Sequence, residues 1–406
     1  PPESPYEFSV IPAQILAEVF SPFLGKVIRL TSGHQALVEE RPELRKAGVP
    51  SGTPQEIAGY IVRKTLFELV KGETPRDIAD LHVLDPACGS GLFLVMAYEF
   101  LLDWHLRWYT ENLVPVTGRG NYSHDAISDL LPGTGEEGVT VCSLPITRCT
   151  AGEGNATREE ITWKLTAGER KRILLATIFG VDIDRRAVGT TRLLLLLKLI
   201  EDMDHDGLPL PDLSGNIRCG NSLVGPDIFD DPDATLIDPR SRERLHVFDW
   251  KAAFPGIMAS GGFDMVTGHL PDFRRESLKG EKEYLEKRYR TFPGTADLYH
   301  CFVEKGMTLL RPGGRFSTIF PDAWLHANDG TMLCMFLRGS GIQEIVDFGN
   351  QGERRAGVLQ SCIIRVINES QAPSLSMVQG AIPETGTFED YLETHRYRLP
   401  SSRLSQ

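Results

Sequence analysis

The chain has 406 residues, of which 41% are hydrophobic and 24% are charged, as in an ordinary globular protein with one large domain or two. Its formal net charge of -12 differs from that of a typical nucleic-acid-binding domain, although a separate module can supply a basic surface. The seven cysteines form no CxxC pair, and no apolar run reaches the length of a membrane span. We therefore expect a cytoplasmic protein without a metal site.

The first predicted elements are helices. Residues 1–47 carry helical patterning, amphipathic at first and then strongly charged, which predicts a helical connector packed on a larger domain. A further helix is expected to open at Thr53 and Pro54, because threonine can cap a helix and proline fits its first position. The main domain is predicted over residues 48–370.

A glycine-rich loop comes next. The sequence DPACGSG, Asp85 to Gly91, lies between a short apolar strand and a long apolar helix. Glycines there let a ligand approach the backbone, and the first turn of the helix offers free N–H groups. The spelling differs from the G-x-G-x-x-G pattern of dinucleotide sites. The loop alone is compatible with any nucleotide cofactor or with a plain glycine turn.

Residues of about 110–166 are rich in Gly, Ser, Thr, Asn and Asp without a sustained period, which predicts an irregular insertion. The strand after it ends in GVDID, so that Asp182 or Asp184 can meet ribose hydroxyls or cap the following helix; we favour the ribose role for Asp182. Strands and helices then alternate, which predicts a Rossmann-like, doubly wound α/β sheet. Residues 371–406 are predicted to be a linker or the start of a truncated module.

These blocks together resemble one enzyme family. DPACGSG, GVDID, CGNSL and FDMVTG occur in the order found in adenine-N6 DNA methyltransferases of type IIG-like and type ISP-like restriction–modification enzymes, and the likeness runs from about Phe23 to Ile367. The resemblance implies a class I methyltransferase fold over residues 48–370 that binds S-adenosylmethionine. It implies that the cofactor is contacted by residues of four blocks, namely Thr53, Pro54, Asp85, Ala87, Cys88, Gly89, Gly91, Asp182 and Asn221.

The catalytic loop departs from the family pattern. The family has (Asn/Asp)-Pro-Pro-(Tyr/Phe), in which the polar side chain accepts from the adenine amino group and the aromatic ring stacks on the flipped base. Here these positions are His269, Leu270, Pro271 and Asp272, followed by Phe273, which could stack if the loop were shifted by one residue. Two further substrate-side blocks differ, with Ser51 and Gly52 in one and Glu353 and Arg354 in the other.

The resemblance therefore implies a site-specific, adenine-N6 DNA methyltransferase of a restriction–modification or phage-defence system, with impaired catalysis. The alternative is a non-catalytic S-adenosylmethionine-binding scaffold or regulatory subunit. Double-stranded DNA is the expected partner, bound weakly by this part of the protein. A fused or associated nuclease and a target-recognition domain are the other expected partners. The basic residues between Arg274 and Arg290 alternate with glutamates, which favours a solvated helix face over a phosphate contact.

Overall fold

The computed structural model describes most of the chain between Thr53 and Pro400, together with short N-terminal pieces. The described residues are 13, 15–17, 26–30, 36–40, 53–117, 131, 144–150, 161–201, 209–230, 245–271, 281–292, 296–326, 330–338, 340–348, 361–369, 374–379 and 388–400. No helix in these ranges combines the length and the apolar run that a membrane span needs.

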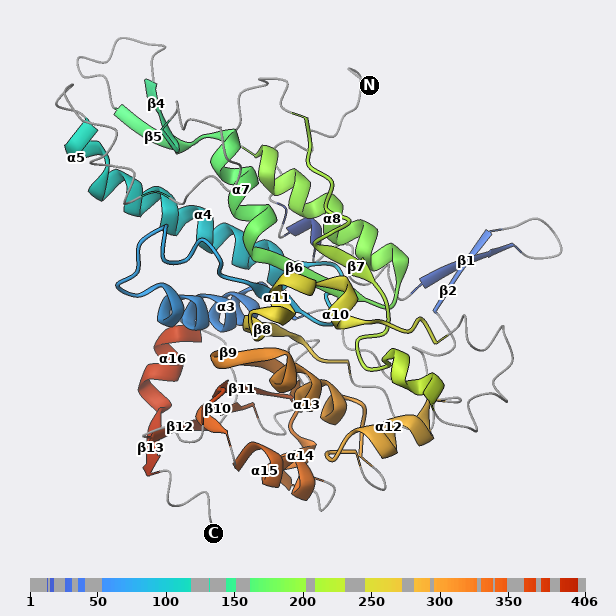
Figure 1. The fold of residues 1–406 in the computed structure, drawn as a ribbon. Helices are drawn as coiled ribbons and strands as arrows, with labels where there is room; N and C mark the ends of the chain where they lie inside the picture. The colour runs from blue at the N-terminus through green and yellow to red at the C-terminus, as the bar shows by residue number, and fades with distance from the viewer. Residues whose placement is uncertain are drawn as a thin grey trace.

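The centre of the described structure is one mixed sheet with the strand order β13-β12-β10-β11-β9-β8-β3-β6-β7 (Figure 1). Its strands are β3 (Val83–Asp85), β6 (Ile178–Asp182), β7 (Ile217–Cys219), β8 (Phe263–His269), β9 (Leu310–Pro321), β10 (Gly341–Asp347), β11 (Ser361–Ile367), β12 (Ser374–Gln379) and β13 (Tyr397–Pro400). The strands from β7 to β9 pair in parallel, and β11 pairs antiparallel with both neighbours. The predicted doubly wound α/β class is confirmed.

Helices cover both faces of this sheet. Successive strand residues point to opposite faces, so Val83 and Met265 belong to one hydrophobic cluster, whereas Leu84 and Val266 belong to the other. The first cluster includes residues of α3 (Gln55–Val70), α4 (Leu92–Asn112), α7 (Ala167–Thr177), α8 (Arg185–Ile200) and α16 (Phe388–His395). The second includes residues of α10 (Trp250–Ala253), α11 (Pro255–Ala259), α12 (Lys282–Arg288), α13 (Tyr299–Leu309), α14 (Ala323–His326) and α15 (Thr331–Arg338). Two shorter elements among the described residues are α5 (Val114–Thr117) and η2 (Pro226–Asp230).

The N-terminal connector is only partly helical. Ala13 and residues 15–17 are helical, but β1 (Lys26–Leu30) and β2 (Ala36–Glu40) form an antiparallel pair. The expectation of helix across this part of residues 1–47 is therefore wrong. The stretch KVIRL is too short for its periodicity to separate strand from helix, and its β-branched Val27 and Ile28 favour a strand.

The predicted insertion is more regular than expected. Helix α4 continues to Asn112, and β4 (Ile146–Thr150) pairs antiparallel with β5 (Ile161–Leu165). The described residues of the predicted irregular stretch therefore include a helix end and a strand pair. A helix cap follows at once, because Thr166 Oγ1 accepts from Glu169 N at the start of α7.

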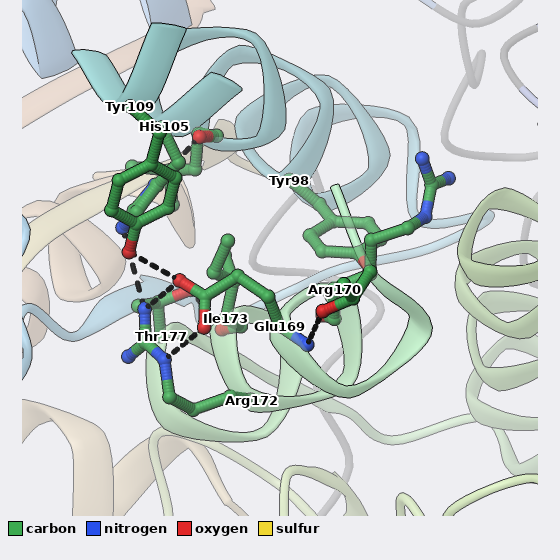
Figure 2. A network of polar contacts seen from close by, with 10 residues as sticks. Tyr98, His105, Tyr109, Glu169, Arg170, Arg172, Ile173 and Thr177 are labelled. Carbon is green, nitrogen blue, oxygen red and sulfur yellow. Dashed lines mark hydrogen bonds and ion pairs between the residues drawn. The ribbon is translucent and has the colours of Figure 1, made fainter. Parts of the chain in front are cut away.

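A buried polar network fastens α7 to α4, the helix that follows the glycine loop (Figure 2). Arg172 donates to both oxygens of Glu169 at 2.8 and 2.7 Å, and the Tyr109 hydroxyl donates to the same carboxylate at 2.7 Å. Burial opposes ionisation of Glu169, but these donors hold its pKa below the usual value. Burial lowers the pKa of the adjacent His105 to about 4, which keeps its ring neutral at pH 7. The network fastens the C-terminal half of α4 to the first turn of α7.

The C-terminal segment belongs to the sheet. Strand β12 pairs in parallel with β10, and β13 pairs with β12. Leu375, Val378, Phe388 and Leu392 are buried, so the described residues after 371 pack as part of the core and the expectation of a linker is wrong for them.

Helix α3 holds this C-terminal segment through buried charges. The Glu344 carboxylate accepts from Tyr60 at 2.8 Å and from Arg396 at 2.8 Å, and Arg365 lies 3.3 Å from it. Glu344 is only 2% exposed. Removing any one of these three partners would therefore leave its buried negative charge with fewer hydrogen bonds or positive charges to stabilise it.

Candidate functional site

The glycine loop is shaped by close contacts with α8. Gly91, directly before α4, has a φ of 86°, and a methyl group on it would lie 2.9 Å from the Thr191 side chain. Only glycine fits both the left-handed backbone and that approach. Cys88 N donates to Val181 O at 3.1 Å, which ties the loop to β6. The Cys88 thiol is buried and its pKa is raised by burial, so Cys88 packs inside the loop and is not poised as a nucleophile.

The two acids at the end of β6 have different roles. Asp184 caps α8, with its carboxylate accepting from Arg186 N at 3.0 Å. Asp182 instead faces the glycine loop and accepts from Gly89 N at 2.9 Å and from Asp184 N at 2.8 Å. The structure thus assigns helix capping to Asp184, and it places Asp182 beside the loop where a bound nucleoside would lie.

Asp85 lies at the centre of the site. Its side chain is 1% exposed and accepts from Ala87 N at 3.0 Å. Gly268 in β8 allows the carboxylate to lie against the backbone, since a methyl group at Gly268 would be 2.5 Å from Asp85 Oδ1. Burial raises the pKa of Asp85 to about 8, and its backbone hydrogen bond opposes that shift. Such a carboxyl group is suited to a cationic ligand, which would stabilise its charged form.

We expect Asp85→Asn to become more stable relative to the parent chain as the pH rises from 5 to 8. The folded parent holds the Asp85 proton up to a pKa of about 8, against 3.8 in the unfolded chain, so its contribution to the free energy of unfolding falls as the pH rises through this window. Urea unfolding at four pH values measures the difference. Asp77→Asn is the control, because hydrogen bonds from Thr74 lower the pKa of Asp77 from 3.8 and its window lies below pH 5. Equal pH trends for the two variants would contradict the role of burial at Asp85.

His269 is the last residue of β8, and it contacts the segment before α3. Its Nδ1 lies 2.7 Å from Thr53 Oγ1. The expected capping by Thr53 is wrong, because Pro54 occupies the N-cap position without a side-chain cap and the Thr53 hydroxyl faces His269 instead. Burial lowers the pKa of His269 to about 4, so the ring is neutral at pH 7. Thr53 thereby fixes the orientation of the His269 ring.

The next residues define how the loop leaves the sheet. Leu270 is fully buried, and its N–H donates to Ile319 O at 3.0 Å, which prolongs the pairing of β8 with β9 by one bond. Pro271 is partly exposed. Asp272 and Phe273 lie outside the described residues, as do Ser51, Gly52, Glu353 and Arg354.

Asn221 follows β7 and forms a tight turn. Its Oδ1 accepts from Leu223 N at 3.0 Å, and its own N–H donates to His246 O at 2.7 Å. The carboxamide of Asn221 also hydrogen-bonds to the Glu281 carboxylate. Glu281 was not singled out from the sequence, where nothing distinguishes it from the other glutamates of its helix.

The sheet order brings these residues to one edge. Because β7, β6, β3 and β8 are adjacent and parallel, their carboxyl ends place Asn221, Asp182, Asp85 and His269 side by side. Ligands of open α/β sheets bind at this edge. Among the described residues, no group of three or more His, Cys, Asp or Glu side chains is arranged to hold a metal ion. The edge combines a glycine loop, the Asp182 carboxylate at the end of β6 and the buried Asp85 carboxyl group, a set of groups that suits a nucleoside cofactor with a cationic tail.

Comparison with known proteins agrees with this architecture. The family model described as the Eco57I restriction-modification methylase matches residues 176–353. The type II restriction enzyme and methyltransferase RM.Eco57I of Escherichia coli is 24% identical over 379 residues, covering 91% of this chain and 33% of that protein. RM.MjaORFECS2P of Methanocaldococcus jannaschii is 47% identical over 251 residues, covering 60% of this chain and 15% of that protein. This chain thus spans a third or less of the length of both relatives.

A solved structure shares the fold. The ATP-dependent Type ISP restriction-modification enzyme LlaBIII bound to DNA superimposes with a TM-score of 0.52 at 12% identity, covering 86% of this chain and 22% of that one. At that identity the likeness concerns the fold alone. The strand order and the family match thus agree: residues 176–353 match the Eco57I restriction-modification methylase model, and they lie within an α/β fold that this solved structure shares.

Proposed function

We propose that this chain is the S-adenosylmethionine-binding methyltransferase part of a restriction–modification or phage-defence enzyme directed at adenine N6 in DNA, with strongly impaired transfer. The proposal rests on a difference between two sets of residues at one sheet edge, those on the cofactor side and those of the substrate loop. Asp85, the glycine loop and Asp182 are arranged to hold the cofactor, whereas the first position of the substrate loop is His269, which is tied to Thr53.

Each site residue is proposed to contact a different part of the cofactor. The cofactor, when bound, supplies an electrophilic methyl group. The backbone of the glycine loop packs along its amino-acid part, the Asp85 carboxyl group lies where a cationic amine gains most, and Asp182 accepts from ribose hydroxyls. Asn221 and its neighbours lie beyond β7, where the base of a nucleoside would follow. Thr53 and Pro54, directly before α3, would lie near the amino-acid end of the cofactor.

Isothermal titration calorimetry with S-adenosylhomocysteine, the demethylated product, tests the cofactor half of the proposal. Binding with a stoichiometry near one is the expected result. An absence of binding by a chain that melts cooperatively would refute both the impaired enzyme and the alternative, a non-catalytic cofactor-binding scaffold. One observation supports the scaffold: the His269 ring is neutral and already hydrogen-bonded to Thr53. A methyl-transfer assay distinguishes the impaired enzyme from the scaffold.

DNA binding is expected to be weak, to lack sequence preference, and to fall as the salt concentration rises. The total charge is -12. In α12, the described part of the segment between Arg274 and Arg290, exposed glutamates alternate with exposed lysine and arginine residues, so the helix can neutralise few DNA phosphates. A mobility-shift titration with two unrelated duplexes at two salt concentrations measures this. Tight binding to only one duplex would show that residues 1–406 read bases.

A further inference from the structure

Helix α12 is fastened along the segment that follows β7. The Tyr284 hydroxyl donates to Asp227 Oδ1 at 2.8 Å and accepts from Gly225 N at 3.1 Å. One turn on, the Tyr289 hydroxyl donates to Leu223 O at 2.7 Å, and Leu285 between them is buried. These contacts fix α12 along residues 223–227, which follow the turn that Asn221 forms.

Glu281 stands directly before α12 and points its carboxylate at Asn221. Its carbonyl accepts from Leu285 N at 2.9 Å, so its backbone is part of the first turn. Its carboxylate hydrogen-bonds to the Asn221 side chain, and burial raises the pKa of Glu281 to about 7 despite that bond. Within the described residues, no Lys, Arg or His forms an ion pair with Glu281. The carboxylate therefore has lone pairs in excess of its donors.

Asn221 is poorly placed to be the only acceptor at this position. Its Oδ1 is engaged by Leu223 N at 3.0 Å, and its amide is engaged by Glu281. Both bonds hold the turn together. A charged acceptor also binds an amino group more strongly than a neutral carboxamide does. The stronger acceptor beyond the end of β7 is Glu281.

Resting on the proposed function, we infer that Glu281 is the residue that recognises the exocyclic amino group of the cofactor's adenine, with Asn221 as the residue that positions its carboxylate. An amino group at the 6-position donates to a carboxylate. Above pH 7, where Glu281 is ionised and has no proton to donate, a 6-oxo purine would instead direct an oxygen at it and be rejected, so the affinities are compared at pH 8. Glu281 thus selects an adenosyl cofactor over its inosyl analogue.

Calorimetry with two stable probes tests this inference. S-adenosylhomocysteine should bind the parent chain about tenfold to a hundredfold more tightly than S-inosylhomocysteine, the range expected for a hydrogen bond to a charged group. Glu281→Gln should reduce this preference to within about threefold, because a carboxamide can present either a donor or an acceptor. Glu283→Gln is the matched control on the same helix, since Glu283 is exposed, and it should retain the full preference.

The outcomes separate the inference from the proposed function. If the parent chain binds neither probe, the proposed function fails. If it binds both equally, or if Glu281→Gln retains the preference, Glu281 does not recognise the base although the cofactor site stands. Should Glu281→Gln not fold, as judged by its melting curve, Glu281→Asp keeps the charge but withdraws it by one methylene. That variant should bind S-adenosylhomocysteine more weakly, and unchanged affinity would overturn the inference.

Discussion

Incubated with radiolabelled S-adenosylmethionine and adenine-rich DNA, the chain is expected to transfer negligible methyl. The amino nitrogen of a flipped adenine must be held in line with the methyl group, and errors of about 1 Å can cost on the order of a hundredfold in rate. His269 has one ring nitrogen hydrogen-bonded to Thr53, and the Leu270 side chain is fully buried, so neither presents the amide acceptor that the family loop supplies. Single-stranded or mismatched DNA should be used, because flipping costs least there.

A repaired loop is the matched comparison. His269→Asn with Asp272→Tyr should raise the rate, but only modestly while Arg354 replaces the second stacking aromatic, and adding Arg354→Phe should raise it further. Leu270 should be kept, because proline there would remove the N–H bonded to Ile319 O and a fully buried side chain. Robust methylation by the unaltered chain would overturn the prediction, and would mean that His269 and Phe273 form a working pocket.

Asp182→Ala is expected to weaken S-adenosylhomocysteine binding by about a hundredfold. The substitution removes the acceptor for Gly89 N at 2.9 Å and the acceptor proposed for the ribose, so both the loop and the ligand lose a charge-assisted hydrogen bond. Calorimetry gives the affinity, and the melting temperature shows how much of the change is structural.

Asp184→Ala is the control for this variant. Asp184 is two residues away and caps α8, so its removal should cost about 1 kcal/mol of stability while leaving the affinity nearly unchanged. Equal losses of affinity in both variants would show that the strand end acts only through the fold. An unchanged affinity in Asp182→Ala would remove the ribose assignment.

Much of the central fold could be predicted from the sequence, because its information is local. Strand β3, the glycine loop and α4 follow each other with matching periodicity, and the glycines are required where the backbone turns left-handed. Asp182 at the end of β6 could be located in the same way. The family resemblance supplied the role of each block, which periodicity cannot supply.

The remaining features depend on contacts between distant residues. Strand β12, SLSMVQ, is short and half polar, and Leu375 and Val378 become buried once β12 pairs with β10 in the sheet. The pair Thr53-Pro54 is a typical sequence for the start of a helix, yet the Thr53 hydroxyl contacts His269, 216 positions away. Glu281 gains its partner only when α12 packs on the segment after β7. Local patterns carry no record of such pairings.

The position of α3 also affects how the protein is made. This helix lies early in the chain, but its polar partners are synthesised late, with Glu344 following Tyr60 by 284 positions and Glu389 following Arg63 by 326. At ordinary translation rates the interval is on the order of tens of seconds. During that time the apolar face of the nascent α3 lacks strands β8 to β11 and is open to chaperones. Completion of the sheet is therefore a late event on the ribosome, and a ribosome stalled before Phe263, where β8 begins, should leave α3 sensitive to proteases.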